Sequence, residues 1–248
     1  MGISHNLVTS AWENGILVTR DLSQRVVDVL APRKVILNPC QQASAATTVK
    51  FGADWLVTAV NSGAVTGGNV VTLTTGAADD DNTELATAVG WDPSKGLTLE
   101  CQFAIGDVDE TAINIGFNDA ATEGADALPV MLATTTYTTA ATDCAMINYD
   151  ADATTDLLRA MVVNTNVDAT ALASAVAPLD GVYHTCKIEV APPLGTASFW
   201  VDGVGLGAAS LVLIPTVKFC AYLGVINHDE AAANTLLVKD CAIWQWTV

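Results

Sequence analysis

Two acidic stretches of the chain place several potential oxygen ligands close together. The first is DDDN at 79–82 and the second is NYDADATTD at 148–156. Calcium binds clusters of carboxylate and carbonyl oxygens of this kind. Both stretches fall in predicted turns, and the second lacks the glycine and the closing glutamate of a helix-loop-helix calcium loop. We therefore interpret both as solvated acidic turns and expect no metal, with a calcium site as the alternative.

The histidines give no sign of nucleophilic catalysis. His5, His184 and His228 are far apart in the sequence, and no nucleophile is placed beside His184, which lies in a strand-like run near Lys187. A nucleophile and its base must lie within hydrogen-bonding reach, so we interpret His184 as a structural residue. The glycine-rich stretch at 63–68 lacks the lysine and the following helix of a phosphate-binding loop. We expect neither a catalytic residue nor a bound cofactor.

The cysteines are also widely spaced. No two of the six form a CxxC pair, which argues against a metal cluster or a redox motif. Most of them interrupt apolar, strand-like runs, where a free thiol behaves as a small hydrophobic side chain. We expect buried free thiols at four positions: Cys101, Cys186, Cys220 and Cys241.

Six tryptophans could stack on sugar rings or fill a core. In SFWVDG, Phe199 and Trp200 are neighbours on a predicted strand, so one points into the core and the other to the opposite face. Trp244 and Trp246 share one face of the last predicted strand with Ala242. We interpret this pair as core or protein interface, with a sugar platform as the alternative.

Alternation of apolar and polar residues predicts strands through most of the chain. The run 96–109 keeps Leu97, Cys101 and Ile105 on one face, and the run 111–119 repeats the pattern. The acidic turn DVDE at 107–110 between these runs predicts a hairpin. About ten strands with almost no helix are typical of an all-β fold, either a β-sandwich or a barrel. We expect a two-sheet antiparallel β-sandwich.

The first fifty residues differ from the rest of the chain in composition and in their pattern of apolar residues. Pro32 and Pro39 break this region into short strand candidates, and it holds too few apolar residues to fold by itself. We expect residues 1–50 to be an extended N-terminal arm or strand-exchange segment, and residues 51–248 to form the sandwich domain. The expected partner-binding residues of the arm are Trp12, Arg20, Arg25, Arg33 and Lys34.

The net negative charge of the chain argues against some classes of binding partner. The 248 residues carry a net charge of −17, with 10 Lys and Arg against 27 Asp and Glu. A field of this sign repels nucleic-acid phosphates and anionic membranes, so we expect binding to neither. The N-terminus has no secretory signal pattern, and no apolar run is long enough for a spanning helix.

The C-terminal part of the chain resembles a known fold family. The strand YHTCKIEV at 183–190, the hairpin FWVDG at 199–203 and the strand pattern V-x-D-x-x-I at 238–243 are similar to the back half of the concanavalin A-like lectin/glucanase jelly roll, which includes laminin-G-like domains. The resemblance covers about residues 68–248 and implies carbohydrate binding, carbohydrate cleavage or a structural role. The glucanase branch uses the motif E-x-D-x-x-E, which this chain lacks, so we expect no enzyme.

The low charge, the Ala and Thr content and the N-terminal arm are similar to those of bacteriophage capsid decoration or head-fibre proteins. This likeness predicts a structural virion protein, a homo-oligomer that binds the major capsid protein or other virion subunits after assembly in the host cytoplasm. The alternative is a lectin-like module that attaches to glycans or a host surface.

Overall fold

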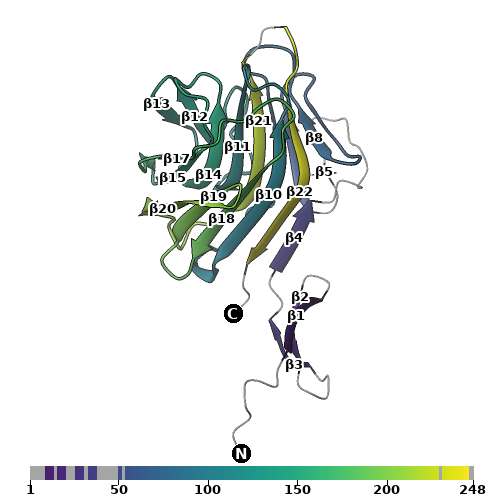
Figure 1. The fold of residues 1–248 in the computed structure, drawn as a ribbon, viewed down its shortest axis with the longest axis vertical. Helices are drawn as coiled ribbons and strands as arrows, with labels where there is room; N and C mark the ends of the chain where they lie inside the picture. The colour runs from purple at the N-terminus through teal and green to yellow at the C-terminus, as the bar shows by residue number, and fades with distance from the viewer. Residues whose placement is uncertain are drawn as a thin grey trace, which may run out of the picture.

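The computed structural model describes residues 54–228 and 231–245 completely. Before residue 54 it describes the backbone of five strands and the side chain of Leu37. Figure 1 shows two large sheets packed face to face, with a small separate sheet near the N-terminus. The predicted all-β sandwich is confirmed. Among the described residues, no helix is long and apolar enough to cross a membrane.

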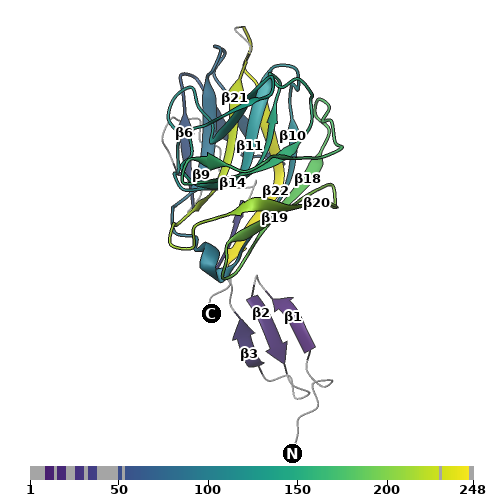
Figure 2. The same cartoon turned by 90° about the vertical axis from the view of Figure 1, so that its left-hand side faces the viewer.

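One layer is an eight-stranded antiparallel sheet. Its strands run in the order β20-β19-β18-β10-β22-β8-β7, and β4 pairs with the second half of β22. Figure 2 brings the edge formed by β19 and β20 to the front. The bounds are β4 (Arg33–Leu37), β7 (Ala64–Thr66), β8 (Val71–Thr74), β10 (Leu97–Ile105), β18 (His184–Ala191), β19 (Thr196–Val201), β20 (Val204–Val212) and β22 (Thr235–Gln245).

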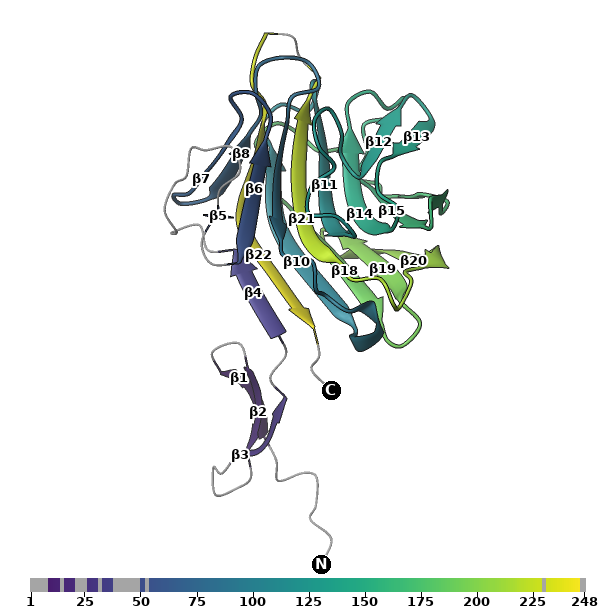
Figure 3. The same cartoon turned by 180° about the vertical axis from the view of Figure 1, so that it is seen from behind.

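The other layer is a nine-stranded antiparallel sheet. Its strands run in the order β16-β15-β14-β11-β21-β9-β6-β5, and β17 pairs with β15. Figure 3 shows β15, β14, β11 and β21 side by side, with β6 farther along the same sheet. The bounds are β5 (Lys50–Phe51), β6 (Trp55–Ala59), β9 (Asn82–Thr87), β11 (Thr111–Asn118), β14 (Cys144–Asp150), β15 (Arg159–Asn164), β16 (Val167–Asp168), β17 (Leu172–Ala173) and β21 (Cys220–Asn227).

Two smaller sheets complete the described elements. One joins β1 (Thr9–Glu13), β2 (Ile16–Arg20) and β3 (Val26–Leu30) within the expected arm. The other is the hairpin of β12 (Val130–Ala133) and β13 (Thr136–Thr139). One short 3-10 turn, Pro93–Lys95, precedes β10.

Apolar residues from the facing sides of both large sheets form the core. On β10 these are the alternating residues predicted from the sequence, including Leu99, Cys101 and Phe103, and on β11 they include Ile113 and Phe117. Each is buried because alternate side chains of a strand point to opposite faces. The predicted inward faces of these strands are therefore confirmed.

The predicted hairpin between β10 and β11 is wrong. β10 pairs with β18 and β22 in the eight-stranded sheet, whereas β11 pairs with β14 and β21 in the nine-stranded sheet. The stretch 106–110 carries the chain from one layer to the other. Alternation specifies which face of a strand is buried, but it does not specify which strand lies beside it.

The hairpin of β19 and β20 has the geometry that its sequence predicts. Asp202 and Gly203 connect the strands with φ angles of 49° and 76°. Two positive φ values belong to the type I′ turn, which suits the twist of paired strands and favours Asp-Gly. The turn sets Phe199 in the core, and the neighbouring Trp200 lies half-buried on the outer face.

The N-terminal segment contributes to the sandwich before residue 51. β4 pairs with β22 from Leu37 opposite Cys241 to Arg33 opposite Gln245. Figure 1 shows β4 alongside β22. Leu37 is buried in the core. The expected boundary at residue 50 itself stays a prediction.

Candidate functional site

The outer face of the eight-stranded sheet carries a row of polar side chains around one tryptophan. Register places Trp200 of β19 opposite Lys187 of β18, Lys187 opposite Glu100 of β10, and Glu100 opposite Ala242 of β22. Their neighbours in the same strands point into the core. Four adjacent strands therefore bring these side chains together on one surface.

A hollow of about 470 Å³ lies over this row. It is an open surface depression of the size that holds a small ligand. The side chains that line it offer an indole, an ammonium, an amide, a hydroxyl and two carboxylates. They are Glu100, Gln102, Thr185, Lys187, Trp200 and Asp240, and Gly203 and Ala242 also line the hollow.

Lys187 connects the aromatic and acidic parts of the hollow. Its Nζ lies 2.5 Å from Oε1 of Glu189 and 3.6 Å from Oε1 of Glu100. The same ammonium lies 5.2 Å from the ring centroid of Trp200. The hydrogen bond to Glu189 is the main cause that raises the pKa of Lys187, so the side chain stays charged. These contacts hold a cation beside the indole face.

A second hollow of about 290 Å³ continues along the same face. Trp244 lines it together with Thr98, Glu189 and Pro192. Trp244 is half-buried and lies opposite Thr98, so it is not a core residue. The part of the prediction that placed Trp244 in the core is wrong, because β22 turns Cys241 and Ile243 inward instead. Trp246 lies outside the described residues.

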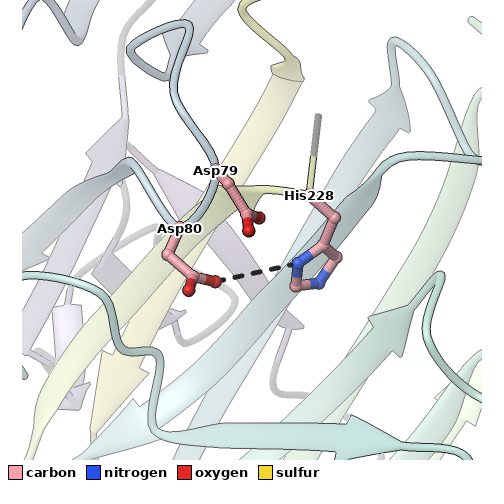
Figure 4. Close-up of side chains that lie close together, drawn as sticks. All are labelled: Asp79, Asp80 and His228. Carbon is pink, nitrogen blue, oxygen red and sulfur yellow. Dashed lines mark ion pairs between the residues drawn. The ribbon is translucent and has the colours of Figure 1, made fainter. Parts of the chain in front are cut away.

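The two acidic stretches singled out in the sequence meet at one end of the sandwich. Figure 4 shows Asp79 and Asp80, from the loop before β9, beside His228, which follows β21. Nδ1 of His228 is 4.0 Å from Oδ1 of Asp80, and its Nε2 is 3.2 Å from Oδ1 of Asp150. The ligand-type atoms of Asp79, Asp80 and His228 lie within 4.8 Å of one another, as do those of Asp150, Asp152 and His228.

Hydrogen bonds fix the inner part of this cluster. Asp150 is almost completely buried and accepts hydrogen bonds from the amides of Leu132 (2.7 Å) and Asp152 (3.1 Å). Burial lowers the pKa of His228, but the hydrogen bond and charge of Asp150 outweigh it and raise that pKa overall. Burial and the charge of Asp79 raise the pKa of Asp80. Carboxylate and imidazole groups in this arrangement could hold a cation.

A third polar group is hidden beneath the loop that follows β11. Glu84 of β9 is completely buried, and its Oε1 accepts hydrogen bonds from Tyr222 Oη (2.7 Å) and the amide of Glu123 (2.9 Å). Burial raises the pKa of Glu84, and burial likewise raises the pKa of Glu123. Sequence reasoning missed this carboxylate pair because its members are far apart in the chain. With Glu84 completely buried, a substrate has no access to its carboxylate.

His184 is hydrogen-bonded to the β19–β20 turn, and its interpretation as a structural residue stays a prediction. Its Nδ1 lies 2.8 Å from Oδ2 of Asp202, which also accepts a hydrogen bond from the amide of Thr185 through Oδ1 (2.8 Å). Burial opposes ionisation of Asp202, but these hydrogen bonds lower its pKa overall. The pair ties the β19–β20 turn to β18.

The predicted partner-binding residues belong to the segment whose side chains are not described. The backbone of Trp12 lies in β1, that of Arg20 in β2, and that of Arg33 and Lys34 in β4. Arg25 lies outside the described residues. In register, Lys34 is opposite Trp244. Partner binding by these five residues stays a prediction.

Comparison with known proteins found no matching family model and no matching curated protein. Solved structures match across most of the chain. The Emp47p carbohydrate recognition domain matches with a TM-score of 0.57 and 13% identity, over 86% of this chain and 97% of that domain. Among structures of endo-acting O-glycanases expressed by prominent members of the human gut microbiota to initiate mucin breakdown, one matches with a TM-score of 0.58 and 11% identity, over 86% and 99%.

The Crh5 transglycosylase matches with a TM-score of 0.52 and 15% identity, over 86% of this chain and 87% of that one. Likenesses at such low identity concern the fold alone, and they agree with the two-sheet sandwich described above. The chain has the concanavalin A-like jelly-roll fold.

Proposed function

We propose that the chain is a carbohydrate-binding domain whose ligand site is the hollow around Trp200. The observation that carries this proposal is the half-buried indole beside the hydrogen-bonding groups of Lys187, Glu100 and Gln102 in one hollow. A sugar ring has apolar C–H faces that pack on an aromatic ring, and hydroxyls that both donate and accept hydrogen bonds. The hollow offers both kinds of contact.

The charge of the site selects the kind of glycan. Glu100 and Asp240 line the hollow with carboxylates that can accept hydrogen bonds, and Lys187, which pairs with Glu189 beside it, is the cation among them. The chain as a whole carries a net charge of −17, which repels anionic ligands. The ligand is therefore a neutral oligosaccharide whose hydroxyls donate to these carboxylates.

The structural neighbours support the same class of ligand. The Emp47p domain is a carbohydrate recognition domain, and the O-glycanases and Crh5 act on glycans. The sequence identity between this chain and each of the three is at most 15%. The support therefore concerns the class of ligand and no particular sugar.

Titration with neutral oligosaccharides, followed by tryptophan fluorescence and calorimetry, tests the proposal. We expect binding to change the emission of Trp200, and Trp200→Ala to weaken affinity on the order of tenfold or more, since a central aromatic contact dominates such sites. Trp244→Ala, on the same face but outside this hollow, is the matched control. Absence of binding by every neutral glycan, or unchanged affinity of Trp200→Ala, would contradict the proposal.

We further propose binding without cleavage. The chain lacks the E-x-D-x-x-E motif of the glucanase branch, and Glu100 in the Trp200 hollow lies 3.6 Å from the ammonium of Lys187. Glycans recovered after the titration should be intact. New reducing ends would show that the chain is an enzyme.

Decoration of a virion shell, with the homo-oligomeric assembly and virion location that it implies, stays a prediction. None of the three structural neighbours described above is a virion protein. Co-sedimentation with assembled capsids, with and without residues 1–50, tests it.

A further inference from the structure

Three free cysteines form a continuous row across the inner face of the eight-stranded sheet. Cys186 of β18 is directly opposite Cys101 of β10, and Cys101 is directly opposite Cys241 of β22. All three are at least 97% buried. Val201 closes one end of the row and Leu37 the other. Two neighbours thus flank the central thiol of Cys101.

The two neighbours of Cys101 are not equivalent, because antiparallel pairs alternate between hydrogen-bonded and non-hydrogen-bonded positions. The amide of Gly106 donates to the carbonyl of Thr235 (2.8 Å), so Gly106 points its backbone groups toward β22. Successive residues of a strand point these groups to opposite sides. The ladder has a bulge between Gln102 and Phe103, but its extra residue, Lys239, is on β22, so the alternation of β10 continues. Counting back along β10, Cys101 therefore points its N–H and C=O toward β18.

An independent hydrogen bond leads to the same assignment. The amide of Asp202 donates to the carbonyl of Thr185 (2.8 Å), so Thr185 points toward β19 and Cys186 toward β10. Cys101 and Cys186 thus form a hydrogen-bonded pair, with Cα atoms about 5.5 Å apart. Cys101 and Cys241 form a non-hydrogen-bonded pair, in which the Cα atoms are about 4.5 Å apart and the side chains are closer.

We propose that Cys101 and Cys241 form a disulfide when the chain folds in the presence of a low-molecular-weight disulfide. Each thiol loses one proton and one electron, the new S–S bond forms, and the oxidant is reduced to two thiols. The Cα separation lies in the range of about 4.4–6.8 Å that a disulfide spans. The bond crosses from β10 to β22, directly beneath the outer residues that line the Trp200 hollow.

Cys186 is the exchange partner of this disulfide. Because the three residues lie in one row, its sulfur faces the central sulfur of Cys101 from the side opposite Cys241. During folding, before β22 is fully docked, the Cys186 thiolate can attack Cys101, form a Cys101–Cys186 bond and release the Cys241 thiolate, which takes up a proton. A bond between Cys186 and Cys241 is excluded, since two strand spacings, about 9.6 Å, separate these residues and a disulfide spans less than about 7 Å.

Oxidation must occur before the sheet is complete. Burial raises the pKa of the Cys101 thiol, and hydrogen bonds with Cys186 and Cys241 raise it further. A buried, protonated thiol is a poor nucleophile, so the folded chain protects the row. The reactive state is the one in which β22 has not yet covered its place between β10 and β8.

Refolding of the unfolded chain with oxidised glutathione, followed by thiol counting and peptide mapping by mass spectrometry, tests the proposal. We expect two of the six thiols to be lost, with Cys101–Cys241 as the main pair and Cys101–Cys186 as the minor one. The oxidised protein should unfold at a midpoint higher by on the order of 5–10 °C, because the bond closes a long loop.

Variants separate the row from unspecific oxidation. Cys101→Ala should abolish pairing within the row, and Cys241→Ala should convert the main product to Cys101–Cys186. Cys220→Ala, a buried cysteine in the other sheet, should leave the pairing unchanged. The wild-type chain alone can overturn the proposal. It does so if all thiols are retained, or if the main product pairs Cys186 with Cys241. Glycan binding is a separate readout, so this result stands apart from the proposed function.

Discussion

At the scale of single residues, the sandwich holds polar groups where burial changes their chemistry. Glu84 is the clearest case, because it lies completely buried against Tyr222 and its second carboxylate oxygen, Oε2, has no hydrogen-bond partner among the described residues. Burial raises its pKa above the ordinary value of 4.5. A carboxylate whose pKa is higher in the folded state favours folding below the unfolded pKa, and this contribution is lost as the pH rises through the folded pKa.

We therefore predict that Glu84→Gln stabilises the chain at neutral pH. Glutamine keeps an oxygen for Tyr222 and the amide of Glu123 but never ionises, so the gain should be on the order of 1 kcal/mol at pH 7 and shrink toward pH 4. Urea unfolding at both pH values measures it. The exposed Glu110→Gln is the control and should change stability by less than about 0.5 kcal/mol. A lower stability of Glu84→Gln at pH 7 would show that the charge is stabilising.

At residue scale the candidate site was only partly predictable. The oxygen-rich stretches at 79–82 and 148–156 are visible in the sequence, but their meeting at His228 depends on the register of β9, β14 and β21. Alternation indicated that either Phe199 or Trp200 lies on the outer face, but the hollow around Trp200 was not predicted. Its residues come from four strands, and each appears in the sequence as an ordinary polar position on an alternating strand.

At the scale of elements, the β19–β20 hairpin sets the position of Trp200. Its turn requires a positive φ at Gly203, whereas an added Cβ there would meet no atom within 4 Å. Substitution therefore tests backbone conformation without a steric clash.

Gly203→Ala should lower the free energy of unfolding by about 1 kcal/mol, the cost of a left-handed conformation for a residue with a Cβ. Denaturant titration measures the loss. Gly68→Ala is the matched control, because Gly68 has no positive φ and its added Cβ would lie 3.9 Å from the carbonyl oxygen of Val70, an ordinary van der Waals contact. Equal stability of the two variants would contradict the assigned turn.

The buried faces of the strands could be predicted better than the pairing of one strand with another. Alternation places Leu99, Phe103, Ile113 and Phe117 in the core correctly, since burial of one face leaves a local pattern. The same pattern suggested a β10–β11 hairpin that does not exist. Pairing partners are set by long-range contacts between layers, and one local turn motif carries no information on them.

At the scale of the whole molecule, the net charge of −17 acts on stability. Self-repulsion of like charges destabilises a compact state, and salt screens it over a Debye length of about 10 Å at 0.1 M. We predict that the thermal midpoint rises by a few degrees between about 0.02 and 0.2 M sodium chloride. Calorimetry at pH 7 measures the change, and a midpoint that falls with salt would show that local ion pairs such as Lys187–Glu189 dominate instead.

The position of β22 has a consequence for synthesis on the ribosome. This strand fills the gap between β10 on one side and β8 and β4 on the other, yet it is the last of the described strands to be translated. Until it emerges, the nascent chain keeps two unpaired edges facing an open slot, which is a template for pairing with other chains. Premature stop codons just ahead of Thr235 should therefore yield inclusion bodies.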